Sequence, residues 1–169
     1  MMQSVINAFI LLFVVIDPIG VAPTYAALTR NYPRAASRAT ALRGVSVALA
    51  IFVFFTFGGR TLLRYLGVGM PAFTIAGGIL LFLLAVDMVL VRQSGLRTVI
   101  PSEQLEAEHR DDISVFPLAI PMIAGPGSLT TVLLLTGDLG WRSAQTWAVL
   151  GVVTVILFIT LLLLLMFAL

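Results

Sequence analysis

Several residue types on which common protein sites depend are absent from this chain. It has no cysteine, no lysine and only 1 histidine among its 169 residues. Without cysteine there is no disulfide framework, no thiol nucleophile and no thiolate metal site. A lone histidine, His109, favours neither a histidine metal site nor a Ser-His-Asp arrangement. We therefore expect no enzymatic activity, no cofactor and no resident metal.

Charged residues are also scarce. They make up 11% of the chain, whereas hydrophobic residues make up 60%. A soluble domain carries about 25% charged residues, so this composition is that of an integral membrane protein. The net charge of +2 comes from arginines in polar connections. It does not indicate nucleic acid, and the expected partner is the lipid bilayer.

The apolar residues fall into five segments, which predict an all-α membrane protein. About 20 residues are needed for a helix to cross the hydrocarbon core. The second segment is short unless it begins near Ala39. The five segments are 5–29, 43–59, 71–91, 113–137 and 146–169.

Arginine predicts the orientation, because it accumulates in cytoplasmic connections. The first and third connections hold seven arginines and the second and fourth hold three. The seven are Arg30, Arg34, Arg38, Arg43, Arg92, Arg97 and Arg110, and the three are Arg60, Arg64 and Arg142. We therefore expect a periplasmic N-terminus. The spacing of Arg30, Arg34 and Arg38 predicts one helix face, either simply solvated or in contact with anionic headgroups.

Two of the apolar segments contain helix-breaking residues. The first has Asp-Pro-Ile-Gly-Val-Ala-Pro at 17–23, and the fourth has Ala-Gly-Pro-Gly-Ser-Leu-Thr at 124–130. Proline removes a backbone donor and glycine adds backbone freedom. At membrane depth the freed backbone groups need protein, water, an ion or a ligand as partners. Such paired interruptions indicate the binding site of a transporter.

The two interrupted segments align as copies of each other. When Ile16 is placed on Ile123, 107 residues later, Gly20 meets Gly127 and Thr24 meets Thr131. The same offset pairs Gly44 with Gly151 in the next segment. The repeating unit thus has three spans, and an odd number of spans inverts the second copy. We expect a first repeat at 1–92, an acidic cytoplasmic loop at 93–112 and a second repeat at 113–169.

The second repeat is one helix short in this chain. The span at 71–91 has no copy, and the same offset places its copy beyond Leu169. We therefore expect an inverted 3+3 repeat with discontinuous first and fourth helices, from which the sixth helix is missing.

Asp17 is the most informative single residue. An ionised carboxylate at membrane depth costs at least about 2.5 kcal/mol and needs a partner or a proton. It can cap a helix that starts at Pro18, bind a coupling cation (Na⁺ or H⁺), do both, or lie idle at the interface.

The second break predicts a half-helix whose first amides face a ligand. Such amides lack carbonyl partners and favour a carboxylate. The alternative is a plain kink satisfied by neighbouring hydroxyls and water. The predicted substrate-binding residues are Gly20, Thr24, Gly125, Gly127, Ser128, Thr130 and Thr131.

These motifs resemble the MarC family of bacterial inner-membrane proteins. The resemblance rests on the run at 17–23, on Phe-Pro-Leu-Ala-Ile-Pro at 116–121 leading into 124–130, and on Ile-Ala-Gly-Gly-Ile at 75–79. It implies six spans in two inverted halves. Some members, of the SnatA kind, transport small neutral amino acids such as glycine and alanine.

The leading hypothesis is therefore an inner-membrane secondary transporter of a small neutral solute, driven by an ion gradient. The alternatives are an assembly or channel subunit without transport of its own and, less favoured by the residues, an intramembrane lipid enzyme. One membrane carboxylate without a second acid, histidine or cysteine offers little acid–base chemistry. A homo-oligomer is compatible with each of these hypotheses.

Overall fold

The computed structural model describes residues 2–90, 113–137 and 142–167. The described elements are helices, and the acidic loop predicted at 93–112 lies outside the described residues. The helices are α1 (Met2–Ile16), α2 (Pro18–Leu28), α3 (Arg34–Tyr65), α4 (Met70–Leu90), the irregular η1 (Ser114–Ile123), α6 (Pro126–Thr136) and α7 (Ala144–Phe167).

Each predicted span corresponds to one helix or one broken pair. Three units are long and apolar enough to cross a bilayer: Met2–Leu28, Arg34–Tyr65 and Ala144–Phe167. The pair η1 and α6, bent by 57°, makes a fourth. Helix α4 coincides with the predicted span 71–91, although its apolar part at Met70–Leu83 is shorter than the others.

The predicted limits of the second span were wrong. Helix α3 runs for 32 residues from Arg34 to Tyr65, well beyond both ends of 43–59. Hydropathy marks only the apolar middle of a helix, whereas arginine is itself a good helix former. The prediction that Arg30 shares a helix face with Arg34 and Arg38 was also wrong, because α2 ends at Leu28.

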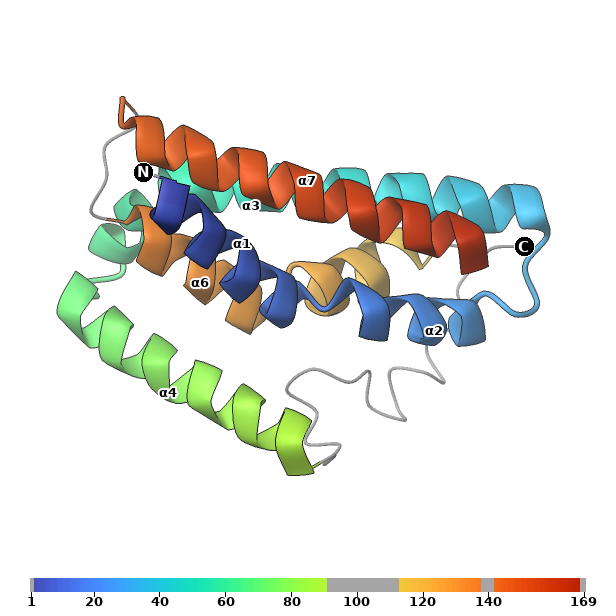
Figure 1. Cartoon of the computed structure of the whole chain (residues 1–169), viewed down its shortest axis with the longest axis horizontal. Helices are drawn as coiled ribbons and strands as arrows, with labels where there is room; N and C mark the ends of the chain where they lie inside the picture. The colour runs from blue at the N-terminus through green and yellow to red at the C-terminus, as the bar shows by residue number, and fades with distance from the viewer. Residues whose placement is uncertain (1, 91–112, 138–141, 168–169) are drawn as a thin grey trace.

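The helices form an elongated bundle in which α1, α2 and α7 run in one direction and α3, η1 and α6 run in the other (Figure 1). Helix α1 continues into α2 along the bundle, and η1 continues into α6 in the opposite direction. Helix α7 packs along α1 and α2, while α3 packs along η1 and α6. The fully buried side chains between them include Leu12, Tyr25, Phe52, Leu118 and Ile156. The two broken pairs are thus embedded in the bundle.

The hairpin between α2 and α3 is closed by a buried tyrosine. The Tyr25 hydroxyl donates to the carbonyl oxygen of Ser37 and lies 3.0 Å from the Ser37 hydroxyl. Tyr25 is fully buried. These bonds tie the end of α2 to the first turns of α3.

Helix α4 lies apart from the others and packs mainly on α6 (Figure 1). A methyl group on Gly77 would overlap with the Thr130 side chain, so glycine permits this close approach. The neighbouring Gly78, in contrast, has open space beside it. Large apolar side chains of α4 such as Ile75, Ile79 and Phe82 remain exposed.

The aligned glycines Gly44 and Gly151 should respond in opposite ways to alanine. A Cβ on Gly44 would overlap with the buried Leu118 side chain, whereas one on Gly151 meets no atom within 4 Å. Overpacking costs about 1–3 kcal/mol, so Gly44→Ala should lower the free energy of unfolding by that amount. Gly151→Ala should raise it by about 0.5–1 kcal/mol. Unfolding of both variants in one detergent measures the difference, and equal effects would contradict this packing.

Candidate functional site

The first break is centred on Asp17. Helix α1 ends at Ile16, and Asp17 adopts the left-handed conformation with φ 49° and ψ 66°. Few residues other than glycine adopt this conformation readily, and aspartate is one of them. Pro18, which needs no amide hydrogen, is the first residue of α2. The predicted interruption of the first span near 17–20 is therefore confirmed.

Asp17 caps the helix that follows it. Its Oδ1 accepts a hydrogen bond from the Gly20 amide at 3.1 Å, and its carbonyl oxygen accepts from the Val21 amide at 3.0 Å. A Cβ on Gly20 would overlap with the Asp17 carboxylate, so glycine makes room for the cap. The predicted capping role, with Pro18 as the first helical residue, is confirmed. The predicted coupling role is not tested by this geometry.

The second break spreads over a longer stretch. Phe116 and Ile120 have extended backbone angles inside η1, and each precedes a proline. A proline disfavours helical angles in the residue before it. Ala124 and Gly125 then separate η1 from α6, and the two segments bend by 57°. The predicted interruption near 124–127 is confirmed, but the irregular backbone starts earlier than expected.

Gly125 is the N-terminal cap residue of α6 and has no side chain to offer. A Cβ at this position would overlap with the carbonyl oxygen of Pro121, a backbone atom that cannot rotate away. The close approach of η1 thus excludes a capping side chain here. Pro126 follows as the first helical residue, and the Leu129 amide donates to the Gly125 carbonyl at 3.0 Å.

The two broken pairs therefore differ in one respect that matters chemically. Helix α2 has its own carboxylate at its N-terminus, whereas α6 has no side-chain cap. The amides of Gly127 and Ser128 lie in the first turn of α6, where the helix supplies no acceptor. Both residues are buried. Amides in this position attract an anion, and a carboxylate is one that they bind.

The predicted hydroxyls are close to these amides but are engaged with the backbone. Ser128 donates to the carbonyls of Ile123 and Gly125, both at 3.0 Å. Thr131 donates to the Gly127 carbonyl at 2.8 Å, and Thr24 donates to the Gly20 carbonyl at 3.1 Å. Their oxygens can still accept hydrogen bonds, because a hydroxyl has two lone pairs. To donate to a substrate, these hydroxyls would first have to break their hydrogen bonds to the backbone carbonyls.

The predicted substrate-binding and coupling residues lie at the two helix breaks, and one of them also contacts α4. Asp17, Gly20 and Thr24 lie along the start of α2, and the others lie at the start of α6. Thr130 packs against Gly77 of α4. Among the described residues, no three His, Asp or Glu side chains come together as a metal site would require. At the first break, Asp17 is the carboxylate next to which a cation could bind.

An apolar groove of about 510 Å³ runs beside the second break. It lies between α3 and the joint of η1 with α6 and offers no polar group to a solute. Its lining residues are Val47, Ala50, Ile51, Phe54, Phe55, Ile120, Ala124 and Leu129.

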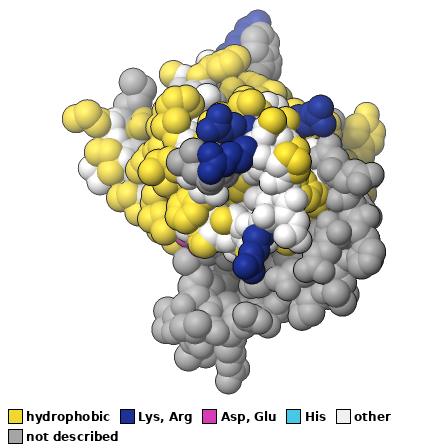
Figure 2. Space-filling model, turned by 90° about the vertical axis from the view of Figure 1, so that its right-hand side faces the viewer, with side chains coloured by type: hydrophobic (Ala, Val, Ile, Leu, Met, Phe, Trp, Pro, Cys, Tyr) yellow, Lys and Arg dark blue, Asp and Glu magenta, His cyan; other side chains and the backbone are white. Residues whose placement is uncertain are grey.

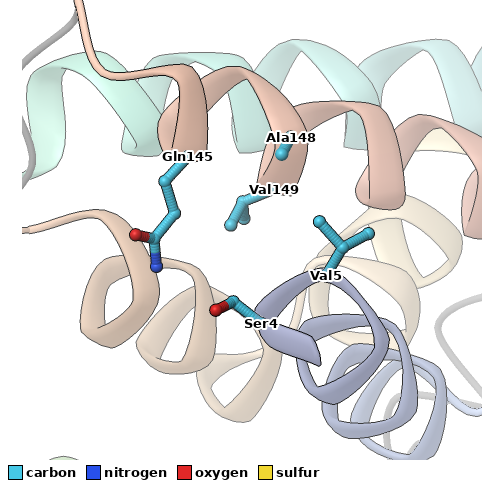
Figure 3. Close-up of a pocket in the computed structure, with 5 residues that line it drawn as sticks. All are labelled: Ser4, Val5, Gln145, Ala148 and Val149. Carbon is cyan, nitrogen blue, oxygen red and sulfur yellow. The ribbon is translucent and has the colours of Figure 1, made fainter. Parts of the chain in front are cut away.

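A smaller and more polar cavity of about 250 Å³ lies between the starts of α1 and α7. Figure 3 shows the Ser4 hydroxyl and the Gln145 amide directed toward the same space, with Val5 and Val149 beside them. This cavity is at the predicted periplasmic end. Sequence analysis did not identify Ser4 or Gln145, because single polar residues near span ends give no specific signal.

Comparisons with known proteins identify the family. The family described as "MarC family integral membrane protein" matches residues 2–169. A "UPF0056 membrane protein" of Aquifex aeolicus is 38% identical over 138 residues, which is 79% of this chain and 62% of that protein. The "UPF0056 membrane protein YvbG" of Bacillus subtilis is 31% identical over 156 residues, covering 92% of this chain and 74% of its own length.

The "UPF0056 inner membrane protein YhgN" of Escherichia coli is 32% identical over 135 residues, which is 80% of this chain and 65% of that protein. The chain thus spans about three-fifths of the length of the first of these relatives, 62%. No solved structure matches the chain. The match over nearly every residue, together with the apolar helices, shows that this chain belongs to the MarC family of integral membrane proteins.

Proposed function

We propose that this protein is a secondary transporter of a small neutral amino acid, such as glycine or alanine, driven by an ion gradient. One observation carries the proposal: two broken helices are embedded in one bundle, and only one of them has its own carboxylate. An amino acid brings a carboxylate that fits the other. The proposed protein needs no cofactor and catalyses no covalent chemistry.

We further propose that the two halves form an inverted repeat. The support is that hydrogen bonds recur at the offset of 107 residues. The Thr24-to-Gly20 bond matches the Thr131-to-Gly127 bond. The bond from Thr29 to the Tyr25 carbonyl likewise matches the one from Thr136 to the Val132 carbonyl. The opposite directions of the two broken pairs in Figure 1 support the inversion.

In the proposed site, the substrate carboxylate accepts from the amides of Gly127 and Ser128. Gly127 has no side chain to block the approach of a ligand to its amide, and Gly125 lets the Pro121 carbonyl pass close to the start of α6. The oxygens of Ser128 and Thr131 are available to accept from the substrate's ammonium group. The proposed coupling cation, Na⁺ or H⁺, binds at Asp17. Binding of the cation neutralises the carboxylate that is otherwise costly within the membrane.

The proposed location is the bacterial inner membrane, with the N-terminus in the periplasm. The arginine distribution supports this orientation. The chain has no cysteine, so single introduced cysteines report sidedness without background. A cysteine at position 104 should resist an impermeant thiol reagent in intact cells. Its labelling would reverse the proposed orientation.

Uptake into proteoliposomes tests the function. The full-length natural protein should accumulate radiolabelled glycine or alanine when a proton or sodium gradient is imposed, and collapse of the gradient should stop accumulation. Protein-free liposomes give the background. Uptake that ignores every gradient would indicate a channel, and no uptake of any small neutral amino acid would refute the proposal.

A further inference from the structure

Three arginines lie at the end of the bundle where α2 turns into α3. Arg30 belongs to the short turn after α2, Arg34 is the first residue of α3, and Arg38 follows one turn later. All three are exposed. Figure 2 views this end of the molecule and shows arginine side chains gathered on it. We call Arg30, Arg34 and Arg38 the basic end.

The position of the basic end along the membrane normal follows from its neighbours. Helix α2 ends its apolar span at Leu28, two residues before Arg30. On α3, Leu42 follows Arg38 at the same helical spacing and is 50% exposed. The row of arginines at 34 and 38 is therefore followed by an exposed leucine one turn later, with the exposed Arg43 beside it. This succession matches the passage from the phosphate level of a bilayer into hydrocarbon.

The three arginines are also held in place relative to one another. The turn is closed by hydrogen bonds from the Tyr32 amide to the Thr29 carbonyl at 2.9 Å and from the Ser37 amide to the Pro33 carbonyl at 3.0 Å. The buried Tyr25 hydroxyl, bonded to Ser37, ties α2 to α3 about one turn after Arg34 and directly before Arg38. The arginines of the turn and of the helix thus share a fixed surface.

We propose that the basic end binds the phosphate groups of anionic phospholipids and so selects them from the surrounding bilayer. Guanidinium groups pair with phosphate through parallel hydrogen bonds. Three of them at headgroup level form a site that binds zwitterionic lipids more weakly than anionic ones. A lipid rather than free phosphate is the ligand, because the exposed apolar side chain of Leu42 continues the surface toward the acyl chains. This role is independent of the transported solute.

The test measures lipid enrichment at the basic end itself. A single cysteine at Asn31, an exposed residue of the turn, carries a fluorophore in the otherwise cysteine-free protein. Quenching by headgroup-labelled phosphatidylglycerol is compared with quenching by headgroup-labelled phosphatidylcholine at equal mole fraction in liposomes. We expect phosphatidylglycerol to be enriched. Each Arg→Gln change among Arg30, Arg34 and Arg38 should lower the enrichment by about five-fold.

The other end of α3 supplies a matched control. Arg60 and Arg64 are exposed and have the same spacing as Arg34 and Arg38. They lie about 33–45 Å from Arg34 and Arg38 along the helix, several times the screening length of about 8 Å at physiological salt. R60Q/R64Q should therefore leave the enrichment at position 31 unchanged. Arg→Lys changes at the basic end keep the charge but lose the parallel hydrogen bonds, so they should keep only part of the enrichment.

Two results would overturn the proposal. One is that the R30Q/R34Q/R38Q protein shows an unchanged phosphatidylglycerol enrichment at position 31. Its melting temperature in phosphatidylcholine must equal that of the wild type, so that the variant is known to be folded. The other is competition by millimolar inorganic phosphate, which would make free phosphate the ligand. If the triple variant does not fold, the same measurement is made on R34Q, whose exposed side chain at the first residue of α3 is not needed for packing. An unchanged enrichment in R34Q would then overturn the proposal.

Discussion

Replacing Asp17 with asparagine is expected to reduce ion-driven uptake to background while the folded protein remains in the membrane. Asparagine keeps the oxygen that accepts from the Gly20 amide at 3.1 Å. It also tolerates the left-handed conformation with φ 49°. The cap and the backbone of the break are therefore preserved, and the change removes only the charge. Uptake in proteoliposomes with an imposed gradient, together with the melting temperature, measures both effects.

Asp17→Ala separates the two roles of this residue. Alanine removes the cap, which costs about 1 kcal/mol, and it is strained in the left-handed conformation by about 1–2 kcal/mol. We therefore expect a clear loss of stability with alanine and almost none with asparagine. Normal uptake with unchanged ion dependence in Asp17→Asn would reduce Asp17 to a helix cap and remove the coupling site from the proposed mechanism.

The breaks in the helices could be predicted because they are encoded locally. Asp17 and Pro18 carry a recognisable cap and first-turn signal, and both were placed correctly. The irregular backbone at Phe116 and Ile120 was placed too late in the sequence. The signal was present, because Pro117 and Pro121 each restrict the residue before them. The expected break at 124–127 relied on Gly125, Pro126 and Gly127.

Contacts between distant segments could not be predicted in the same way. The bond from Tyr25 to Ser37 depends on how the α2–α3 hairpin closes, which no local pattern fixes. The overlap that excludes a side chain on Gly125 is with Pro121, only four residues earlier, but it depends on the irregular path of the backbone through η1. The hydroxyl bonds of Ser128 and Thr131 are an intermediate case, since such residues in helices often bond the preceding turn.

Replacing Gly125 with alanine is expected to impair both the fold and the proposed carboxylate site. The new Cβ would overlap with the Pro121 carbonyl oxygen, so η1 and the start of α6 must separate. Overpacking of this kind costs about 1–3 kcal/mol of stability. The shift also moves the amides of Gly127 and Ser128, and a misplacement of about 1 Å in a binding geometry can cost about 10²-fold. We therefore expect a strongly raised KM for the amino acid in the protein that still folds.

Gly78→Ala is the matched control, because a Cβ at Gly78 meets no atom within 4 Å. It should raise stability by about 0.5–1 kcal/mol, as is expected for Gly151→Ala, and leave KM close to that of the unsubstituted protein. The atom of Pro121 that overlaps with the new Cβ of Gly125→Ala is its backbone carbonyl oxygen. As a second control, side-chain changes at position 121 that keep this carbonyl in place should not restore the stability or the KM of Gly125→Ala. If Gly125→Ala transports substrate with unchanged KM, the start of α6 does not form the carboxylate site, and the proposed substrate position must be abandoned. The coupling role of Asp17 is not affected by this result, because Asp17→Asn tests it separately.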